Sequence, residues 1–271
     1  MLLQGKRALI MGVANNRSIA WGIARAFHRQ GAGLAFTYQG ERLRENLVGL
    51  LGELGGADRF PIFPCDVTSD AEIAAVFDGL RARWGALDVL VHCLAFAGRD
   101  ELTRPFVEIS RGGYAQALDI SAYSLIRCTA AARPLLEAAG GGSVMTLTYN
   151  AVERVVPSYG VMAIAKAALE TEVRYLAAEL GPANIRVNAI SAGPIRTLAA
   201  SAVRGISGFR DAMEEVAPLR RNVTTEEIGD VAVFLASDLA RAVTGNLIFA
   251  DSGFHVMSAA GMLELRRKDG G

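Results

Sequence analysis

Tyr159 and Lys166 lie seven residues apart in SYGVMAIAKAALE, and a second tyrosine, Tyr149, stands ten residues before Tyr159. On a helix a seven-residue step makes nearly two turns, so both side chains project from one face. The phenol can donate a hydrogen bond to an oxygen that gains negative charge, and the ammonium adds a positive field. The spacing therefore indicates hydride-transfer chemistry. A buried tyrosine and a surface lysine that share a helix face by chance would show the same spacing.

Composition excludes several classes of protein. The chain has 271 residues, 51% of them hydrophobic, which suffices for one large α/β core. Its 28 basic and 28 acidic residues balance, so no long-range field favours nucleic acid or an anionic membrane. The N-terminal apolar stretch is too short for a signal peptide, and no run is long enough to span a membrane. Cys65, Cys93 and Cys128 lie outside any CxxC pattern, so we expect reduced thiols, a cytoplasmic location and no metal site.

Short apolar runs alternate with longer amphipathic patterns along the chain. The runs predict buried parallel strands at residues 7–13, 33–38, 60–65, 88–93, 143–148, 185–190 and 246–250. The patterns between them predict helices at residues 19–29, 70–83, about 113–136, 159–180 and 228–236. This alternation predicts an α/β fold with a single Rossmann-type doubly wound parallel sheet and helices on both faces. We expect one dinucleotide-binding and catalytic domain over residues 1–271.

The candidate site residues follow the predicted strands directly. Ligands of doubly wound sheets bind beyond the carboxyl ends of the strands. In strand order those ends carry Gly12, Gln39, Asp66, residues 93–97, Tyr149 and residues 194–199. The sequence thus predicts one site assembled from six strand ends.

The first of these ends reads GVANNRSIAWGIA, from Gly12 to Ala24. Small residues there let the backbone approach a pyrophosphate, and Ser18 is placed to cap a helix whose first amides hold the anion. The segment lacks the GxGxxG fingerprint, and an ordinary β-to-α turn would look similar.

The next two strand ends carry polar side chains suited to the adenosine part of a dinucleotide. Gln39 occupies the position where many NAD-binding chains have an acid, and an amide can still bond a ribose hydroxyl. Asp66, in CDVTS, can accept from the adenine amino group, or it can cap the helix that follows. Both interpretations of Asp66 stay open at this point.

Together these motifs resemble the short-chain dehydrogenase/reductase superfamily and, within it, the bacterial NADH-dependent enoyl-acyl carrier protein reductases of fatty acid synthesis. The resemblance covers nearly the whole chain and is carried by GVANNRSIAWGIA, FTYQGERL, the tyrosine–lysine spacing and VNAISAGPIRTLAAS. Most of the superfamily has Tyr-x-x-x-Lys, whereas here Ala163 stands four residues after Tyr159. Ser121, in DISAY, replaces the asparagine that relays protons in the wider superfamily. Both departures argue against ordinary ketone reduction.

The resemblance implies a role for each candidate residue. Tyr149, Tyr159 and Lys166 would be catalytic: Tyr159 would donate to the thioester oxygen, Lys166 would hold the nicotinamide ribose, and Tyr149 would wall the acyl pocket. The NADH-binding positions would be Gly12, Ser18, Ile19, Gln39, Asp66, Val67, Leu94, Lys166, Ile195, Arg196, Thr197, Leu198 and Ala199. The substrate-binding positions would be Ala97, Tyr149, Tyr159 and Met162.

The same resemblance implies an enoyl substrate linked to acyl carrier protein, a homotetramer, and a substrate lid around residues 198–209. A plain surface loop would contain the same lid glycines. Cys93 and Ala95 replace the serine and glycine that are common at these positions in the family, a change that is typical of a divergent paralogue. Two other functions remain: a short-chain dehydrogenase that acts on a ketone or alcohol, and a non-catalytic dinucleotide-binding protein.

Overall fold

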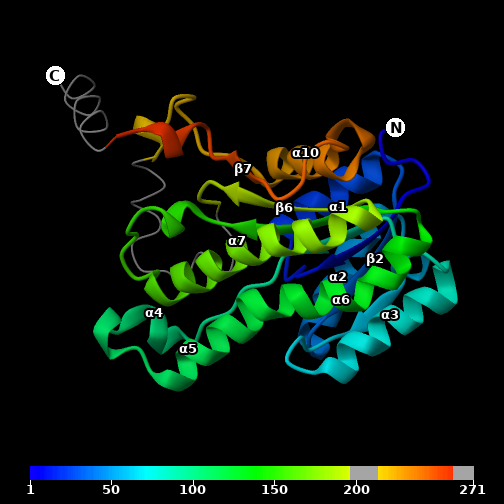
Figure 1. Ribbon diagram of the computed structural model, residues 1–271, viewed down its shortest axis with the longest axis horizontal. Coiled ribbons are helices and arrows are strands. Elements are labelled where there is room, and N and C mark those ends of the chain that lie inside the picture. The colour runs from blue at the N-terminus through cyan, green and yellow to red at the C-terminus, as the bar shows by residue number, and fades with distance from the viewer. Residues whose placement is uncertain (196–212, 259–271) are drawn as a thin grey trace.

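The structure is a computed structural model that describes residues 1–195 and 213–258. Its centre is a parallel seven-stranded sheet in the order β3-β2-β1-β4-β5-β6-β7, which winds outward in both directions from β1 and β4 (Figure 1). The strands are β1 (Arg7–Met11), β2 (Gly33–Tyr38), β3 (Ile62–Pro64), β4 (Val89–His92), β5 (Gly142–Thr148), β6 (Ile185–Ala192) and β7 (Leu247–Ala250). The predicted doubly wound Rossmann-type sheet is confirmed.

Helices cover both faces of the sheet. The α-helices are α1 (Ile19–Arg29), α2 (Glu41–Leu51), α3 (Asp70–Trp84), α4 (Arg99–Thr103), α5 (Arg111–Leu118), α6 (Ser124–Ala138), α7 (Gly160–Leu180) and α10 (Thr225–Ala236). The short 3₁₀ turns are η1 (Gly52–Leu54), η2 (Ala57–Arg59), η3 (Phe106–Glu108), η5 (Asn150–Val152), η6 (Gly181–Ala183), η7 (Asp238–Ala240) and η8 (Phe254–Val256). One face carries α1, α2 and α10, and the other carries α3, α6 and α7. Helices α4 and α5 lie beyond the carboxyl edge of the sheet, beside the start of α7 (Figure 1).

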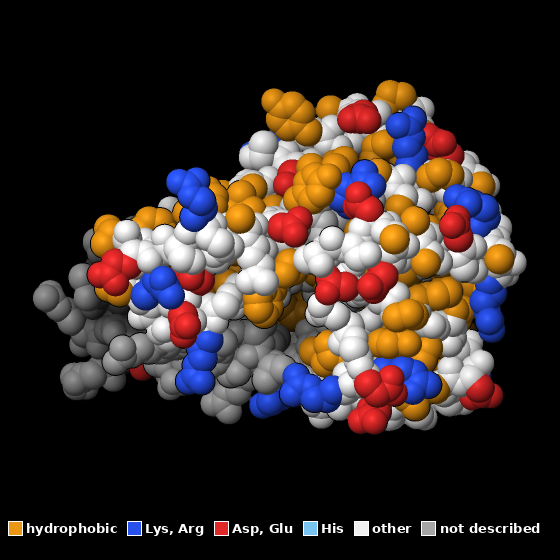
Figure 2. Space-filling model, turned by 90° about the horizontal axis from the view of Figure 1, so that it is seen from below, with side chains coloured by type: hydrophobic (Ala, Val, Ile, Leu, Met, Phe, Trp, Pro, Cys, Tyr) orange, Lys and Arg blue, Asp and Glu red, His pale blue; other side chains and the backbone are white. Residues whose placement is uncertain are grey.

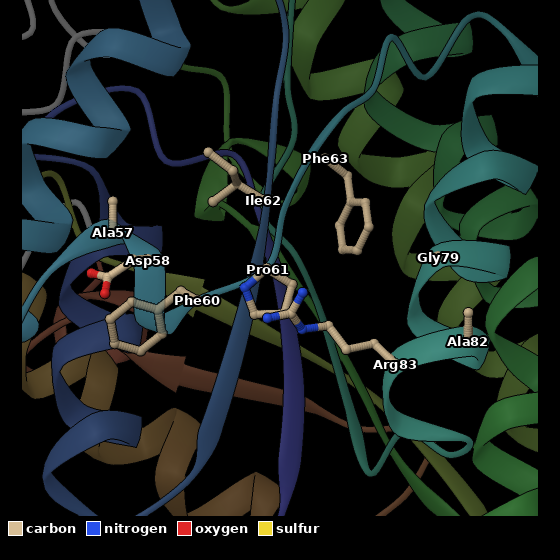
Figure 3. Close-up of a pocket in the computed structure, with 9 residues that line it drawn as sticks. All are labelled: Ala57, Asp58, Phe60, Pro61, Ile62, Phe63, Gly79, Ala82 and Arg83. Atoms are coloured by element: carbon tan, nitrogen blue, oxygen red, sulfur yellow. The ribbon is translucent and has the colours of Figure 1, made fainter.

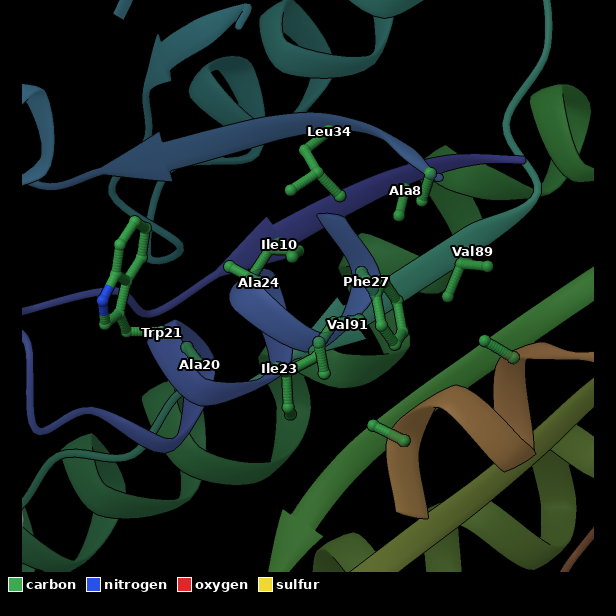
Figure 4. Close-up of a cluster of buried hydrophobic side chains, with 14 of the residues drawn as sticks. Ala8, Ile10, Ala20, Trp21, Ile23, Ala24, Phe27, Leu34, Val89 and Val91 are labelled. Carbon is green, nitrogen blue, oxygen red and sulfur yellow. The ribbon is translucent and has the colours of Figure 1, made fainter. Parts of the chain in front are cut away.

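The protein has a hydrophobic core on each face of the sheet, because successive side chains of a strand point to opposite faces. In β1, Ala8 and Ile10 pack under α1 with the fully buried Trp21 and Phe27, as Figure 4 shows. Their neighbour Leu9 instead packs toward α3 and α6. A strand buried on both faces needs a continuous apolar run, which is why these runs predicted the strands.

The predicted helix at about 113–136 is wrong as a single element. Helix α5 ends at Leu118, a π-helical turn η4 (Asp119–Tyr123) follows, and α6 begins at Ser124. The fully buried Ser121 accepts from the Phe96 amide at 2.9 Å and donates to the Phe96 carbonyl at 3.1 Å. These bonds tie the widened turn to the segment after β4, a long-range contact that local periodicity does not contain.

The predicted strand at 60–65 is also too long: β3 spans Ile62–Pro64, and one backbone hydrogen bond to β2 flanks it on each side, from the Phe36 amide to the Pro61 carbonyl and from the Cys65 amide to the Tyr38 carbonyl. Pro61 and Pro64 have no N–H to donate, so the edge strand stays short.

Candidate active site

Three predicted catalytic side chains converge from two elements. Tyr149 follows the last residue of β5, and Tyr159 occupies the N-cap position of α7 rather than its first turn. The two rings meet edge to face, with 5.3 Å between centroids and 69° between planes. Lys166, on the second turn of α7, is only 5% exposed, and its Nζ donates to the Leu94 carbonyl at 3.4 Å. A phenol and an ammonium therefore face the carboxyl ends of β4 and β5.

Burial determines the protonation of these groups. It raises the pKa of Tyr159 to about 12, so the phenol stays protonated and can donate a hydrogen bond at neutral pH. Burial also raises the pKa of Tyr149, whose hydroxyl has no hydrogen-bond partner among the described residues. Burial disfavours the charged form of Lys166 and therefore lowers its pKa to about 8.

Three of the four predicted substrate-binding residues, Ala97, Tyr159 and Met162, share one apolar cluster. Ala97 and Tyr159 pack against the buried Met162, with Leu102 from α4 completing that side. Ser121 approaches the same place, with its hydroxyl 3.9 Å from the Met162 sulfur. The structure therefore brings together residues from the end of β4, from α4 and from α7 beside the Tyr159 phenol.

The first strand end forms a close-packed turn around Gly12. The φ angle of Gly12 is 93°, and an added Cβ would lie 2.1 Å from the Cys93 carbonyl oxygen. Ser18 does not cap α1 as predicted: its Oγ accepts from the amides of Ala14 at 3.1 Å and Asn15 at 3.0 Å. The Ser18 side chain does not cap α1 and the Trp21 amide bonds to the Ser18 carbonyl at 3.0 Å, so the amides of Ile19 and Ala20 are the ones placed to bind an anion, which fits a pyrophosphate.

Gln39 and Asp66 meet at the neighbouring strand ends. Gln39 Nε2 donates to Asp66 Oδ2 at 2.8 Å, and the Thr68 amide donates to Asp66 Oδ1 at 2.9 Å. The hydrogen bonds from Thr68 lower the pKa of Asp66. The cap of α3 is Ser69, which accepts from the Glu72 amide, so the alternative reading of Asp66 as that cap is wrong. The pair presents an amide and a carboxylate to solvent, which fits the hydroxyls and amino group of an adenosine.

Comparison with known proteins identifies the family. Residues 12–255 match the family described as enoyl-(acyl carrier protein) reductase. This chain belongs to the enoyl-acyl carrier protein reductase family. It is 54% identical to the NADH-dependent enoyl-acyl carrier protein reductase of Nostoc sp., over 94% of this chain and 98% of the relative. The corresponding Bacillus subtilis enzyme is 50% identical over 94% of this chain and 97% of its own length.

Solved structures agree with these sequence matches. The Bacillus cereus enoyl-acyl carrier protein reductase, solved with NADP⁺ and indole naphthyridinone, has a TM-score of 0.92 at 52% identity and covers 95% of this chain and 99% of its own. The Aquifex aeolicus enzyme has a TM-score of 0.91 at 46% identity, over 96% of this chain and 100% of its own. The predicted reductase family, reaction class and NADH cofactor are confirmed.

Two hollows lie on the described part of this reductase. One of about 180 Å³ adjoins the active-site tyrosine and is lined by Tyr149, Asn150, Arg154, Val155, Val156, Ala192, Gly193, Met213, Asp251 and Phe254. The other, about 520 Å³, lies between β3 and the end of α3, where Phe63 and Arg83 line it (Figure 3). It opens at the amino end of β3, away from Tyr159 and Lys166. The smaller hollow is the better acyl-site candidate because it touches a catalytic side chain.

The remaining predicted positions divide into three groups. Ile19 and Ile195 pack against the core under α1, and Val67 and Leu94 pack against the opposite core. Arg196, Thr197, Leu198, Ala199 and the predicted lid at 198–209 lie outside the described residues.

Within residues 1–195 and 213–258 no helix is long and apolar enough to cross a membrane. The same ranges contain no group of three His, Cys, Asp or Glu side chains that could hold a metal ion.

Two buried polar groups near Lys166 were missed by the sequence analysis. His92 ends β4, with Nδ1 3.2 Å from Thr146 Oγ1 and Nε2 2.7 Å from Ser124 Oγ, and burial lowers its pKa to about 3. Glu170 accepts from the Thr148 hydroxyl at 2.6 Å. His92 carries no sequence signal beyond its place in an apolar run. Glu170 does carry a sequence signal, because it lies one turn after Lys166 and so on the same helix face.

Proposed function

We propose that this chain reduces the carbon–carbon double bond of a trans-2-enoyl thioester on acyl carrier protein, with NADH as the hydride donor, during fatty acid elongation. The observation that carries the proposal is the meeting of Tyr149, Tyr159 and Lys166 at the carboxyl ends of β4 and β5 in a member of this reductase family.

The chemistry needs a donor at the thioester oxygen. Hydride arrival at the β-carbon leaves an enolate, and stabilising that charge lowers the barrier. Tyr159 supplies this hydrogen bond without ionising, because burial keeps its phenol protonated. Tyr149 limits where the Tyr159 ring can move and forms a wall of the acyl pocket.

Lys166 and the strand ends would hold the cofactor. The Lys166 ammonium binds the ribose hydroxyls of the nicotinamide nucleoside, and its field favours the developing enolate. The turn at Gly12 and the first amides of α1 bind the pyrophosphate. Gln39 and Asp66 bind the adenosine end. We propose that Ile195, which packs against the core under α1, lines the nicotinamide.

The decisive experiment follows NADH absorbance with crotonyl and acetoacetyl thioesters in parallel. We expect oxidation of NADH with the crotonyl thioester and almost none with the acetoacetyl thioester. Turnover of the acetoacetyl thioester alone would instead assign the chain to ketone reduction. If neither thioester is turned over while NADH still binds, the non-catalytic reading holds.

We further propose a cytoplasmic homotetramer built around one catalytic domain. Tyr123, at the end of η4, is 48% exposed and Tyr175, on α7, is 75% exposed. A second copy of the chain, related by a twofold axis, would cover these exposed rings. Cys65, Cys93 and Cys128 are all free, which suits a reducing compartment. On the face shown in Figure 2 acidic and basic side chains are intermixed, which suits neither nucleic acid nor a membrane surface. Light scattering that gives the mass of one chain would refute the tetramer.

A further inference from the structure

Glu170 is a buried carboxylate that the proposed reaction does not use. It is 9% exposed and lies on α7 four residues after Lys166, so the two side chains share a helix face. Thr148, the last residue of β5, donates its hydroxyl proton to Glu170 Oε1 at 2.6 Å. A buried carboxylate is costly unless it has a hydrogen-bond donor or an opposite charge, and Glu170 has both nearby.

This hydrogen bond joins the two elements that carry the catalytic groups. Thr148 immediately precedes Tyr149, and Glu170 lies one turn beyond Lys166. The end of β5 and the second and third turns of α7 are therefore tied together by a side-chain bond below the active site. A shift of either element would move Tyr149 relative to Lys166.

Glu170 is also a hydrogen-bonded acid that acts on Lys166. His92, the last residue of β4, and Cys93, which follows it, also act on the ammonium. Burial lowers the pKa of His92 to about 3 and raises that of Cys93 to about 12, so both are neutral at physiological pH. From α7, Glu170 and Glu172 face the ammonium. Glu172 Oε2 has no hydrogen-bond partner among the described residues, and burial raises its pKa to about 7.

Burial is the largest influence on Glu170 and raises its pKa above the ordinary value of a glutamate, while its neighbours act in both directions. Thr148, Arg174 and Lys166 lower its pKa, whereas burial and the nearby Glu153 raise it. The phenols of Tyr149 and Tyr159 stay protonated because burial raises the pKa of both. Of the two acids on α7 near Lys166, Glu170 is thus the one whose carboxylate accepts a hydrogen bond among the described residues, from Thr148, and this bond opposes the effect of burial on its pKa.

We propose that Glu170 is a positioning residue of this reductase: held by Thr148, it keeps Lys166 charged and directed toward the cofactor ribose. The inference rests on the proposed role of Lys166 in NADH binding. It follows that Glu170 raises the pH above which NADH binding weakens, because a neutral Lys166 amine holds the ribose less well.

The test measures the NADH dissociation constant by fluorescence titration across the pH range for wild type, Glu170→Gln, Glu170→Asp and Thr148→Val. Wild-type affinity should fall as pH rises through about 8, the pKa of Lys166. In Glu170→Gln the fall should begin about one pH unit lower, with affinity at pH 6 within about twofold of wild type. Glu170→Asp keeps the charge and should restore most of the wild-type profile. Thr148→Val should move the profile in the same direction by less.

The control is Glu179→Gln, an exposed carboxylate on the same helix, which should leave the profile unchanged. A lower melting temperature in Glu170→Gln with an unmoved pH profile would show a purely structural brace and overturn the proposal. Where Glu170→Gln does not fold, Thr148→Val decides, and an unmoved profile overturns the proposal equally. Wild-type protein that binds no NADH at any pH would refute the proposed function itself.

Discussion

The ring of Tyr149 meets the ring of Tyr159 edge to face, with 5.3 Å between centroids, although one residue follows a strand and the other begins a helix. Edge-to-face pairs of this kind restrict both rings. The contact leaves the Tyr159 phenol facing the cluster of Ala97 and Met162. It therefore couples the position of the hydrogen-bond donor to the end of β5.

Replacing Tyr159 with phenylalanine should lower kcat by about 10²-fold or less, because one donor to the enolate is lost. The NADH dissociation constant should change little, since the phenol does not hold the cofactor. Steady-state kinetics with crotonyl thioester and NADH fluorescence titration give the two numbers. An unchanged kcat would show that the donor is another group.

Two substitutions of Tyr149 separate its ring from its hydroxyl. Tyr149→Phe removes a buried hydroxyl that has no hydrogen-bond partner among residues 1–195 and 213–258, so the melting temperature should stay the same or rise. Tyr149→Ala removes the ring contact with Tyr159 and should destabilise by about 3 kcal/mol and lower kcat. Thermal unfolding and kinetics on both variants check this. Equal melting temperatures for the two variants would contradict the packing role.

Lys166→Met should weaken NADH binding by at least about tenfold while stabilising the cofactor-free protein at pH 7. The sign follows from linkage: burial lowers the pKa of Lys166 from 10.5 to about 8, so the unfolded chain binds the proton more tightly. The Lys166 contribution to stability therefore rises with pH between about 8 and 10.5. The free energy of unfolding of the wild type, minus that of Lys166→Met, should therefore increase with pH across that window. A difference independent of pH would contradict a buried charged lysine.

Gly12→Ala should abolish tight NADH binding and lower the free energy of unfolding. Its Cβ would lie 2.1 Å from the Cys93 carbonyl oxygen, so β1 and β4 would have to move apart. Gly40→Ala is the matched control, because Gly40 also has a positive φ, of 76°, but an added Cβ meets no atom of the described residues within 4 Å. Denaturant titrations should place Gly12→Ala about 1–3 kcal/mol below the control. Equal stabilities would show that the strand ends can adapt.

NADH should be preferred to NADPH by at least about tenfold in kcat/KM. A 2′-phosphate beside Gln39 would meet the Asp66 carboxylate, and the nearby Arg44 already pairs with Glu41 at 2.7 Å. Gln39→Arg should narrow the preference, whereas Arg44→Ala should leave it nearly unchanged. Comparable kcat/KM values for the two cofactors in the wild type would contradict this account of the adenosine end.

Local patterns in the sequence were sufficient for the sheet and for the place of the site. Apolar runs and helical periods depend on neighbours along the chain, so Ile19–Arg29 was predicted with both ends correct and every strand was found. Because parallel strands share one carboxyl edge, their order along the chain already grouped Gly12, Gln39, Asp66 and Tyr149. The seven-residue spacing of Tyr159 and Lys166 is likewise a property of one helix.

The tertiary structure alone decided which polar side chains bond to one another. Ser18 turns back to the first loop, Ser121 widens a helix by bonding to Phe96, and Thr148 holds Glu170. Each choice depends on a backbone or side chain that folding brings near. Burial acts in the same way: the lowered pKa of Lys166 comes from the surroundings that the packed strands and α7 create, and no spacing along the chain contains that information.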